Sequence, residues 1–237
     1  MKYLPHQRLI PLLFICLILA ISCTKPDFYP ERIFKEHSRS ELDYFVDVGF
    51  RKGNINKQTK NIEVSIIGTP QKGDIVLIDS IIGELNLLIT PLEIKRVQKG
   101  GNLLIYLTPN YKGVIPKNAA AMTFFQFKIF GIILTETSIW IPPGSSGGVR
   151  EHLFRHEFCH AIGFSHPKIS NMEISKSVML PGCSVVFNNS NEIEPINYLF
   201  SEIDKAVIRI LYDKDIPNGL SRKSFIKAYV KFKKNND

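Results

Sequence analysis

The sequence has few of the residues that build disulfide-rich or repetitive proteins. It contains four cysteines, six histidines and one tryptophan among 237 residues, and no segment recurs at a fixed period. Hydrophobic residues make up 44% and charged residues 22%, a composition that can bury a core in one domain or at most two. No nucleic-acid-binding motif accompanies the net charge of +8, so we expect no nucleic acid as a partner.

A long hydrophobic run, LIPLLFICLILAIS, lies at the N-terminus behind Lys2 and Arg8. It is short for a bilayer span and reads as a secretory signal. Its end, LAISC, resembles the lipobox of bacterial lipoproteins, which implies that Cys23 is the lipidated first residue of the mature chain. We expect a signal peptide over 1–22, a polar tether over 23–42 and a lipid anchor in a membrane of the bacterial cell envelope, on its periplasmic or outer surface. An uncleaved anchor and an ordinary signal peptide are the alternatives.

Two cysteines, Cys159 and Cys183, remain after the signal peptide and the lipidated residue are set aside. Export would place them in an oxidising compartment, where a single disulfide between them is possible. Two buried free thiols are the alternative, and the sequence does not decide between them.

Residues 43–212 carry the pattern of an α+β domain. A β-branched strand is expected at 61–68, and a helix with Asp74 as its cap at 74–89. Two strand candidates follow at 92–98 and 102–109. The segments 120–134 and 137–143 are expected to give two or three more strands, as a hairpin. A helix is expected at 149–163, and a second begins with a capping box, Ser201 to Asp204, and ends near 212. The basic extension 213–237 is expected to be helical and to pack on the domain, with contact to anionic lipid as the alternative.

Three of the six histidines fall in the segment RHEFCHAIGFSH, residues 155–166. His156 and His160 are four apart, so on a helix both imidazoles project from one face and can reach one zinc ion. Glu157 lies beside this pair, where it can hold and deprotonate a water. Gly163 can end the helix and let the chain turn, which brings His166 back as a third ligand. Three protein ligands leave a fourth position open, the arrangement of a catalytic zinc.

The pattern HExxHxxGxxH resembles the signature of the metzincin clan of zinc metallopeptidases. SVM (177–179) resembles the turn that carries a methionine beneath the metal in that clan, and ILYD resembles the end of a matrixin-type catalytic domain. The resemblance implies that the side chain of Met179 forms a hydrophobic base beneath the three histidines. It also implies a twisted mixed sheet with two helices above a cleft, and a small irregular lower subdomain with a C-terminal helix. An edge strand, drawn from AAMTFFQF, would pair with an extended substrate.

These residues predict a zinc metalloendopeptidase with one Zn²⁺ per chain and a protein or peptide substrate. Zinc would be held by His156, His160 and His166, with Glu157 as general base. One alternative is a catalytically silent surface lipoprotein that keeps the zinc and binds a ligand. Another is a structural lipoprotein in which zinc only stabilises the lower subdomain.

Overall fold

The computed structural model describes residues 28–108, 121–128, 133–143, 147–168, 177–180 and 199–236. The predicted signal peptide, the lipidation site Cys23 and the second mature cysteine, Cys183, lie outside these residues. Within the described ranges, no helix is both long enough and apolar enough to span a bilayer.

The described residues form a five-stranded mixed sheet with the order β2-β1-β3-β5-β4. β1, β2, β3 and β5 are parallel, whereas β4 pairs antiparallel with β5 and forms one edge of the sheet. The predicted fold class, a mixed sheet with helices, is therefore confirmed. The strand bounds are β1 Ile62–Gly68, β2 Ile94–Arg96, β3 Leu103–Leu107, β4 Met122–Lys128 and β5 Ile133–Trp140.

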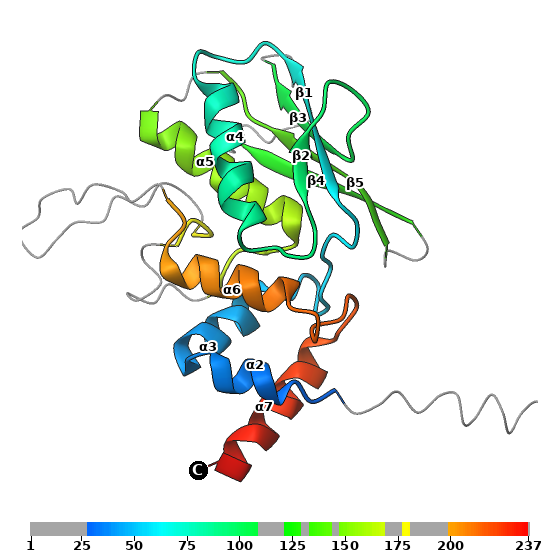
Figure 1. The fold of residues 1–237 in the computed structure, drawn as a ribbon, viewed down its shortest axis with the longest axis vertical. Helices are drawn as coiled ribbons and strands as arrows, with labels where there is room; N and C mark the ends of the chain where they lie inside the picture. The colour runs from blue at the N-terminus through cyan, green and yellow to red at the C-terminus, as the bar shows by residue number, and fades with distance from the viewer. Residues whose placement is uncertain are drawn as a thin grey trace, which may run out of the picture.

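Two helices, α4 (Asp74–Asn86) and α5 (Gly147–Ile162), lie together along the sheet (Figure 1). One face of α4 packs into the core. This face includes Ile78, Ile81 and Leu85, and all three are fully buried. Asp74 differs from its predicted role as cap, because Gly73 is the N-cap and Asp74 is the first helical residue. The Asp74 carboxylate accepts a 2.6 Å hydrogen bond from Nε of Arg150 instead.

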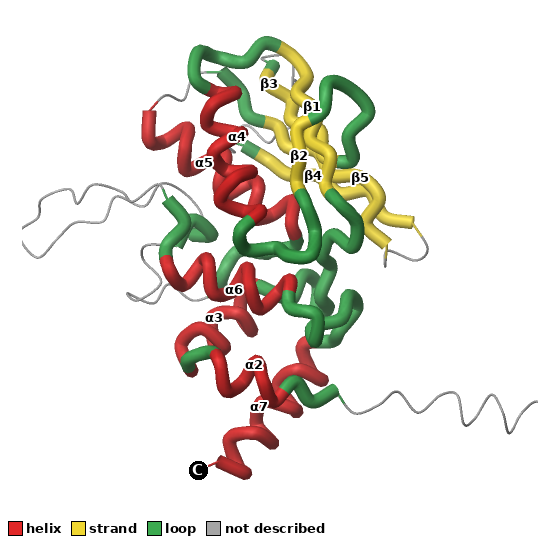
Figure 2. Tube along the Cα trace, in the orientation of Figure 1, coloured by secondary structure: helices red, strands yellow, loops and turns green. Residues whose placement is uncertain are grey.

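Four helices of the described residues lie below the sheet (Figure 2). Residues 31–36 and 39–42 of the predicted tether form α2 and the first turn of α3, so this part of it is helical. Ile33 and Phe34 of α2 are buried, and the Phe34 ring lies 5.5 Å from the Phe225 ring of α7. The four helices are α2 Glu31–Glu36, α3 Arg39–Val48, α6 Glu202–Tyr212 and α7 Arg222–Asn236.

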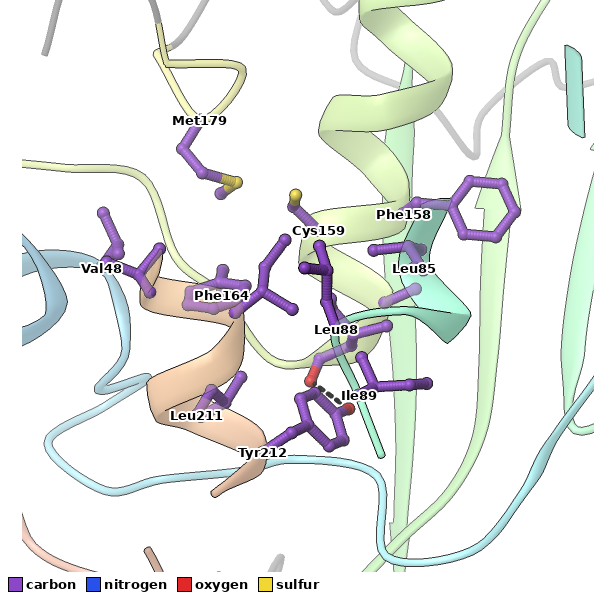
Figure 3. Close-up of a cluster of buried hydrophobic side chains, with 14 of the residues drawn as sticks. Val48, Leu85, Leu88, Ile89, Phe158, Cys159, Phe164, Met179, Leu211 and Tyr212 are labelled. Carbon is purple, nitrogen blue, oxygen red and sulfur yellow. Dashed lines mark hydrogen bonds between the residues drawn. The ribbon is translucent and has the colours of Figure 1, made fainter. Parts of the chain in front are cut away.

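One hydrophobic core connects the sheet and its helices to the lower helices (Figure 3). Cys159 comes from the end of α5, Phe164 from the turn after it, and Leu211 from α6. The hydroxyl of Tyr212 donates a 2.9 Å hydrogen bond to the carbonyl oxygen of Ile162. The C-terminal end of α5 is therefore held firmly against α6, which gives the residues that follow it a defined position.

Candidate metal centre

Helix α5 carries the first two histidines on one face. His156 and His160 are four residues apart, and their Nε2 atoms lie 3.1 Å from each other. α5 is buried on several sides between the sheet and the lower helices, and His156 is only 7% exposed. The two rings therefore hold a fixed mutual orientation at the lower end of the sheet.

A glycine turn returns the third histidine to this pair. Gly163 has a φ of +129°, and a Cβ at this position would lie 2.7 Å from the backbone oxygen of Asn56. After this turn, the backbone N–H of Ser165 donates a 2.8 Å hydrogen bond to Val48 O at the end of α3. His166 follows, with its Nε2 atom 2.9 Å from that of His156 and 3.1 Å from that of His160. Only glycine meets both the dihedral angle and the close approach at position 163.

The three Nε2 atoms lie close enough together to hold one metal ion, and the Nδ1 contacts of two of the rings fit that role. Nδ1 of His156 lies 2.6 Å from Val178 O, and Nδ1 of His160 lies 2.9 Å from Phe164 O. A carbonyl oxygen only accepts, so both Nδ1 atoms carry the proton and both Nε2 atoms present a lone pair. Lone pairs converging on one point repel each other unless a cation lies between them. Imidazole ligands whose other nitrogen donates to a carbonyl are the usual arrangement around zinc.

The protonation of the rings agrees with this donor set. Burial, followed by the neighbouring histidine ring, lowers the pKa of His156 to about 3, and burial lowers that of His160 to about 4. Partial burial, followed by the positive charge of Arg51, also lowers the pKa of His166. The three rings are therefore neutral at neutral pH and available as ligands. Three neutral imidazoles whose ligand atoms lie this close together fit a zinc ion.

The predicted methionine turn lies directly against His156. Val178, whose carbonyl oxygen orients that ring, is followed by Met179, which is 1% exposed. The backbone N–H of Val178 donates to Asp204 at 3.2 Å, and Ser177 Oγ donates to the same carboxylate at 2.5 Å. Asp204 is the capping-box residue of α6, so the helix cap also holds the turn that contacts His156.

Glu157 lies next to the metal ligands with its carboxylate held by the edge strand. It is 4% exposed, and Oε2 accepts a 2.5 Å hydrogen bond from Oγ1 of Thr123 on β4. Burial raises the pKa of Glu157 to about 7, and the hydrogen bond from Thr123 opposes that increase. A carboxylate with a pKa near neutrality can both accept and release a proton at physiological pH.

Other residues also lie near the candidate ligands. His152 is buried one turn before His156, with ring centres 5.8 Å apart. Thr123 lies in the segment expected as the edge strand, but its contact with Glu157 was not expected, and nothing in the local sequence indicates that Arg51 lies near the histidines. Cys159 is buried and its thiol is free in the structure. The disulfide to Cys183 stays a prediction, because that partner lies outside the described residues.

No protein-family model matches the chain, and the comparison with curated proteins finds no match. Among solved structures, two of myroilysin are similar to it, each with 13% sequence identity. One has a TM-score of 0.41 and covers 70% of this chain and 98% of its own. The other has a TM-score of 0.40 and covers 73% of this chain and 96% of its own. A likeness of this degree carries no information about the reaction, which has to be argued from the site itself.

Proposed function

We propose that the chain is a zinc-dependent endopeptidase of the metzincin type, which hydrolyses peptide bonds in protein or peptide substrates. The convergence of three histidine Nε2 atoms within 2.9–3.1 Å of one another, beside a buried glutamate, carries this proposal. His156, His160 and His166 would hold the zinc ion. When bound there, zinc supplies a Lewis acid that polarises a carbonyl group and lowers the pKa of a water.

Glu157 would perform the proton transfers. Its carboxylate accepts a proton from the attacking water as the new carbon–oxygen bond forms, and then donates that proton to the leaving nitrogen as the peptide bond breaks. Thr123 holds the carboxylate at 2.5 Å, so the base is oriented before the substrate arrives. A glutamate with this burial and this hydrogen bond is not needed to bind zinc, which favours an enzyme over a silent binding protein.

The edge of the sheet would bind the substrate. β4 pairs with β5 along one side, and no described strand pairs with its other side. An extended peptide can add to such an edge through backbone hydrogen bonds. Because Thr123 of β4 contacts Glu157, a peptide bound along this strand would pass close to the general base.

The test compares the zinc-loaded chain with its Glu157→Ala variant on a diverse peptide mixture, with products identified by mass spectrometry. We expect cleavage by the parent chain and none by the variant, with one zinc per chain in both. Glu151→Gln, on the same helix, is the matched control and should leave cleavage intact. Equal cleavage by the Glu157→Ala variant and the parent chain would disprove the assigned role of Glu157.

We also propose, from the sequence alone, that the chain is exported and anchored to a bacterial membrane through a lipid on Cys23. The basis is the hydrophobic run that ends in LAISC. An anchored peptidase would act on substrates at the membrane surface on which it lies.

A further inference from the structure

Arg51 lies beside the segment that carries the third histidine. The carbonyl oxygen of Val48, three residues before Arg51, accepts a 2.8 Å hydrogen bond from the backbone N–H of Ser165. Asp47 likewise accepts a 2.8 Å hydrogen bond from the backbone N–H of Lys168. These two bonds flank the third ligand and hold its segment against the end of α3. Arg51 therefore enters the site from the lower helices, next to the metal ligands.

The guanidinium group of Arg51 lies on the face of the edge strand that carries Thr123. Its Cζ atom is 3.5 Å from the centre of the Phe125 ring. Phe125 is two residues after Thr123 on β4, so both side chains lie on the same face of the strand. Stacking on an aromatic ring occupies the flat face of a guanidinium group and leaves its N–H groups in the plane free to donate.

Arg51 has no acidic partner among the described residues, and its Nη1 atom is buried without a hydrogen-bond partner. The two other buried arginines, Arg150 and Arg155, each have an acidic partner, although Nε and Nη1 of Arg155 are also buried without a hydrogen bond. Arg150 lies 2.6 Å from the carboxylate of Asp74, and Arg155 lies 2.6 Å from that of Glu84. Burial lowers the pKa of Arg51, which reflects the cost of holding this charge without an anion. A buried donor left unpaired requires an explanation, and an incoming anion would supply its partner.

The backbone holds Arg51 in place without help from a ligand. Lys52 and Gly53, with φ of 50° and 86°, form a tight turn, and Asn54 N–H donates to Arg51 O at 3.1 Å. The carbonyl oxygen of Gly53 accepts a 2.8 Å hydrogen bond from the first residue of α7, Arg222. A donor fixed in this way loses little conformational entropy when it binds a partner.

We propose that Arg51 binds a carboxylate group of the substrate near the bond that is cleaved. Carboxylates are the anionic groups that an unmodified peptide offers, and the guanidinium fork matches them in shape. The carboxylate would come either from an Asp or Glu side chain or from a free C-terminus. This inference rests on the proposed peptidase function, and it makes Arg51 a residue that determines specificity.

The first experiment maps cleavage sites for the full zinc-loaded chain, purified in detergent, on matched peptide libraries with free and with amidated C-termini. If a side chain is bound, Asp or Glu is enriched at one position in both libraries. If the C-terminus is bound, cleavage occurs at a fixed distance from the free end and is lost after amidation. Arg51→Gln should remove the preference and lower kcat/KM for preferred peptides by roughly 10- to 100-fold.

Two further variants separate the role of the guanidinium fork from that of charge and of folding. Lys60→Gln removes an exposed positive charge outside the site and should leave the preference intact. Arg51→Lys keeps a cation over Phe125 without the fork, so its kcat/KM for preferred peptides should lie between those of the parent chain and Arg51→Gln. Thermal unfolding checks that each variant is folded. An unchanged preference in Arg51→Gln would overturn the inference, and so would a parent chain that prefers neither an acidic side chain nor a free C-terminus.

A binding measurement keeps this test independent of turnover. The zinc-loaded Glu157→Ala variant is titrated with a fluorescent, amidated peptide pool containing Glu and with the same pool containing Gln. The Glu pool should bind more tightly, and Arg51→Gln in the same background should abolish the difference. If the parent chain cleaves nothing but this difference is seen, the peptidase proposal fails while the carboxylate site stands. If the two pools bind equally, and the Gln pool with free C-termini binds no more tightly than its amidated form, the carboxylate site is overturned.

Discussion

Nδ1 of His156 donates a 2.6 Å hydrogen bond to the carbonyl oxygen of Val178. This single contact joins a zinc-ligand candidate on α5 to the turn that precedes α6. It determines which ring nitrogen carries the proton, and therefore which nitrogen faces the other two histidines. The site thus depends on the turn as much as on the helix that carries the ligands.

Thr123→Val should shift the pH dependence of catalysis. The Thr123 hydroxyl donates to the Glu157 carboxylate and so opposes the increase in its pKa that burial causes. Without it, the pKa of Glu157 should rise further. Because the general base must be ionised, the acidic limb of the kcat/KM profile should move to higher pH. Thr59→Val removes an exposed hydroxyl outside the site and is the control. An unmoved acidic limb would show that Thr123 does not act through Glu157.

Asp204→Asn should weaken both the fold and the metal site. Asp204 accepts hydrogen bonds from Ser177, Val178 and Ser201, and an amide nitrogen would face some of these donors. We expect the free energy of unfolding to fall by about 1–3 kcal/mol. We also expect zinc affinity to fall by roughly 10- to 100-fold, because the turn that orients His156 loosens.

The control for Asp204→Asn is Glu202→Gln, which changes an exposed acid in the first turn of the same helix. Chemical denaturation measures stability, and competition with a chelator measures zinc affinity. A stability loss with unchanged zinc affinity would mean that the turn does not control the ligand.

Zinc binding should persist into mildly acidic solution. Protons compete with zinc for the same Nε2 lone pairs. The pKa is about 3 for His156 and about 4 for His160, and the pKa of His166 lies below its ordinary value. The rings therefore stay unprotonated as the pH falls below the ordinary value of about 6.5. From pH 7.5 to 5.5 we expect the zinc Kd to rise roughly ten-fold or less, measured by competition titration.

A site of three histidines with ordinary pKa values would lose zinc affinity on the order of 1,000-fold as the pH falls over the same range. A loss of that size would show that the site does not keep its histidines neutral. At lower pH, zinc and activity should be lost together, because protonated imidazoles cannot bind the metal. Activity that remains after the zinc has dissociated would contradict the proposed mechanism.

Gly163→Ala should destabilise the chain, whereas Gly83→Ala should not. At 163 the φ is +129° and the new Cβ would lie 2.7 Å from Asn56 O, so we expect a loss of about 1–3 kcal/mol. At 83, inside α4, nothing lies within 4 Å of the new Cβ, and alanine should stabilise the helix by about 0.5–1 kcal/mol. Thermal and chemical unfolding measure both changes. Equal effects at the two positions would contradict the turn geometry.

Cys23→Ser should release the chain from the membrane fraction when it is produced in a bacterium. The lipid would be attached to the Cys23 thiol, and serine offers no thiol. Cys16→Ser, within the hydrophobic run, is the matched control and should leave the chain anchored. Cell fractionation and metabolic labelling with a fatty acid measure the outcome. Labelling of the Cys23→Ser variant would exclude this residue as the lipid site.

Local patterns predicted the elements that depend on neighbouring residues alone. The strand at β1, the helix at α4 and the capping box of Ser201 and Asp204 were all expected from spacing and residue type. These features form within one or two turns of chain, so their causes are visible in a short window. β4 was also expected as the edge strand, and it lies at the edge of the sheet.

Of the lower helices, α6 and α7 agree with the sequence prediction, whereas α2 and the start of α3 do not. Polar residues and prolines dominate that segment, and such a composition is typical of a tether. Its apolar residues become a core only by packing against helices from the other end of the chain, as Phe34 does against Phe225. A window of sequence does not reveal a partner at such a separation.

The sequence by itself determined the ligand set, because two histidines at helical spacing and a glycine turn are local features. The tertiary structure alone decided what surrounds the ligands. Thr123 reaches Glu157 across 34 residues, and Asp204 reaches Ser177 across 27. Arg51 reaches the site only because the end of α3 is bonded to the chain after α5. Such contacts follow from how the elements pack, which residue propensity and spacing do not encode.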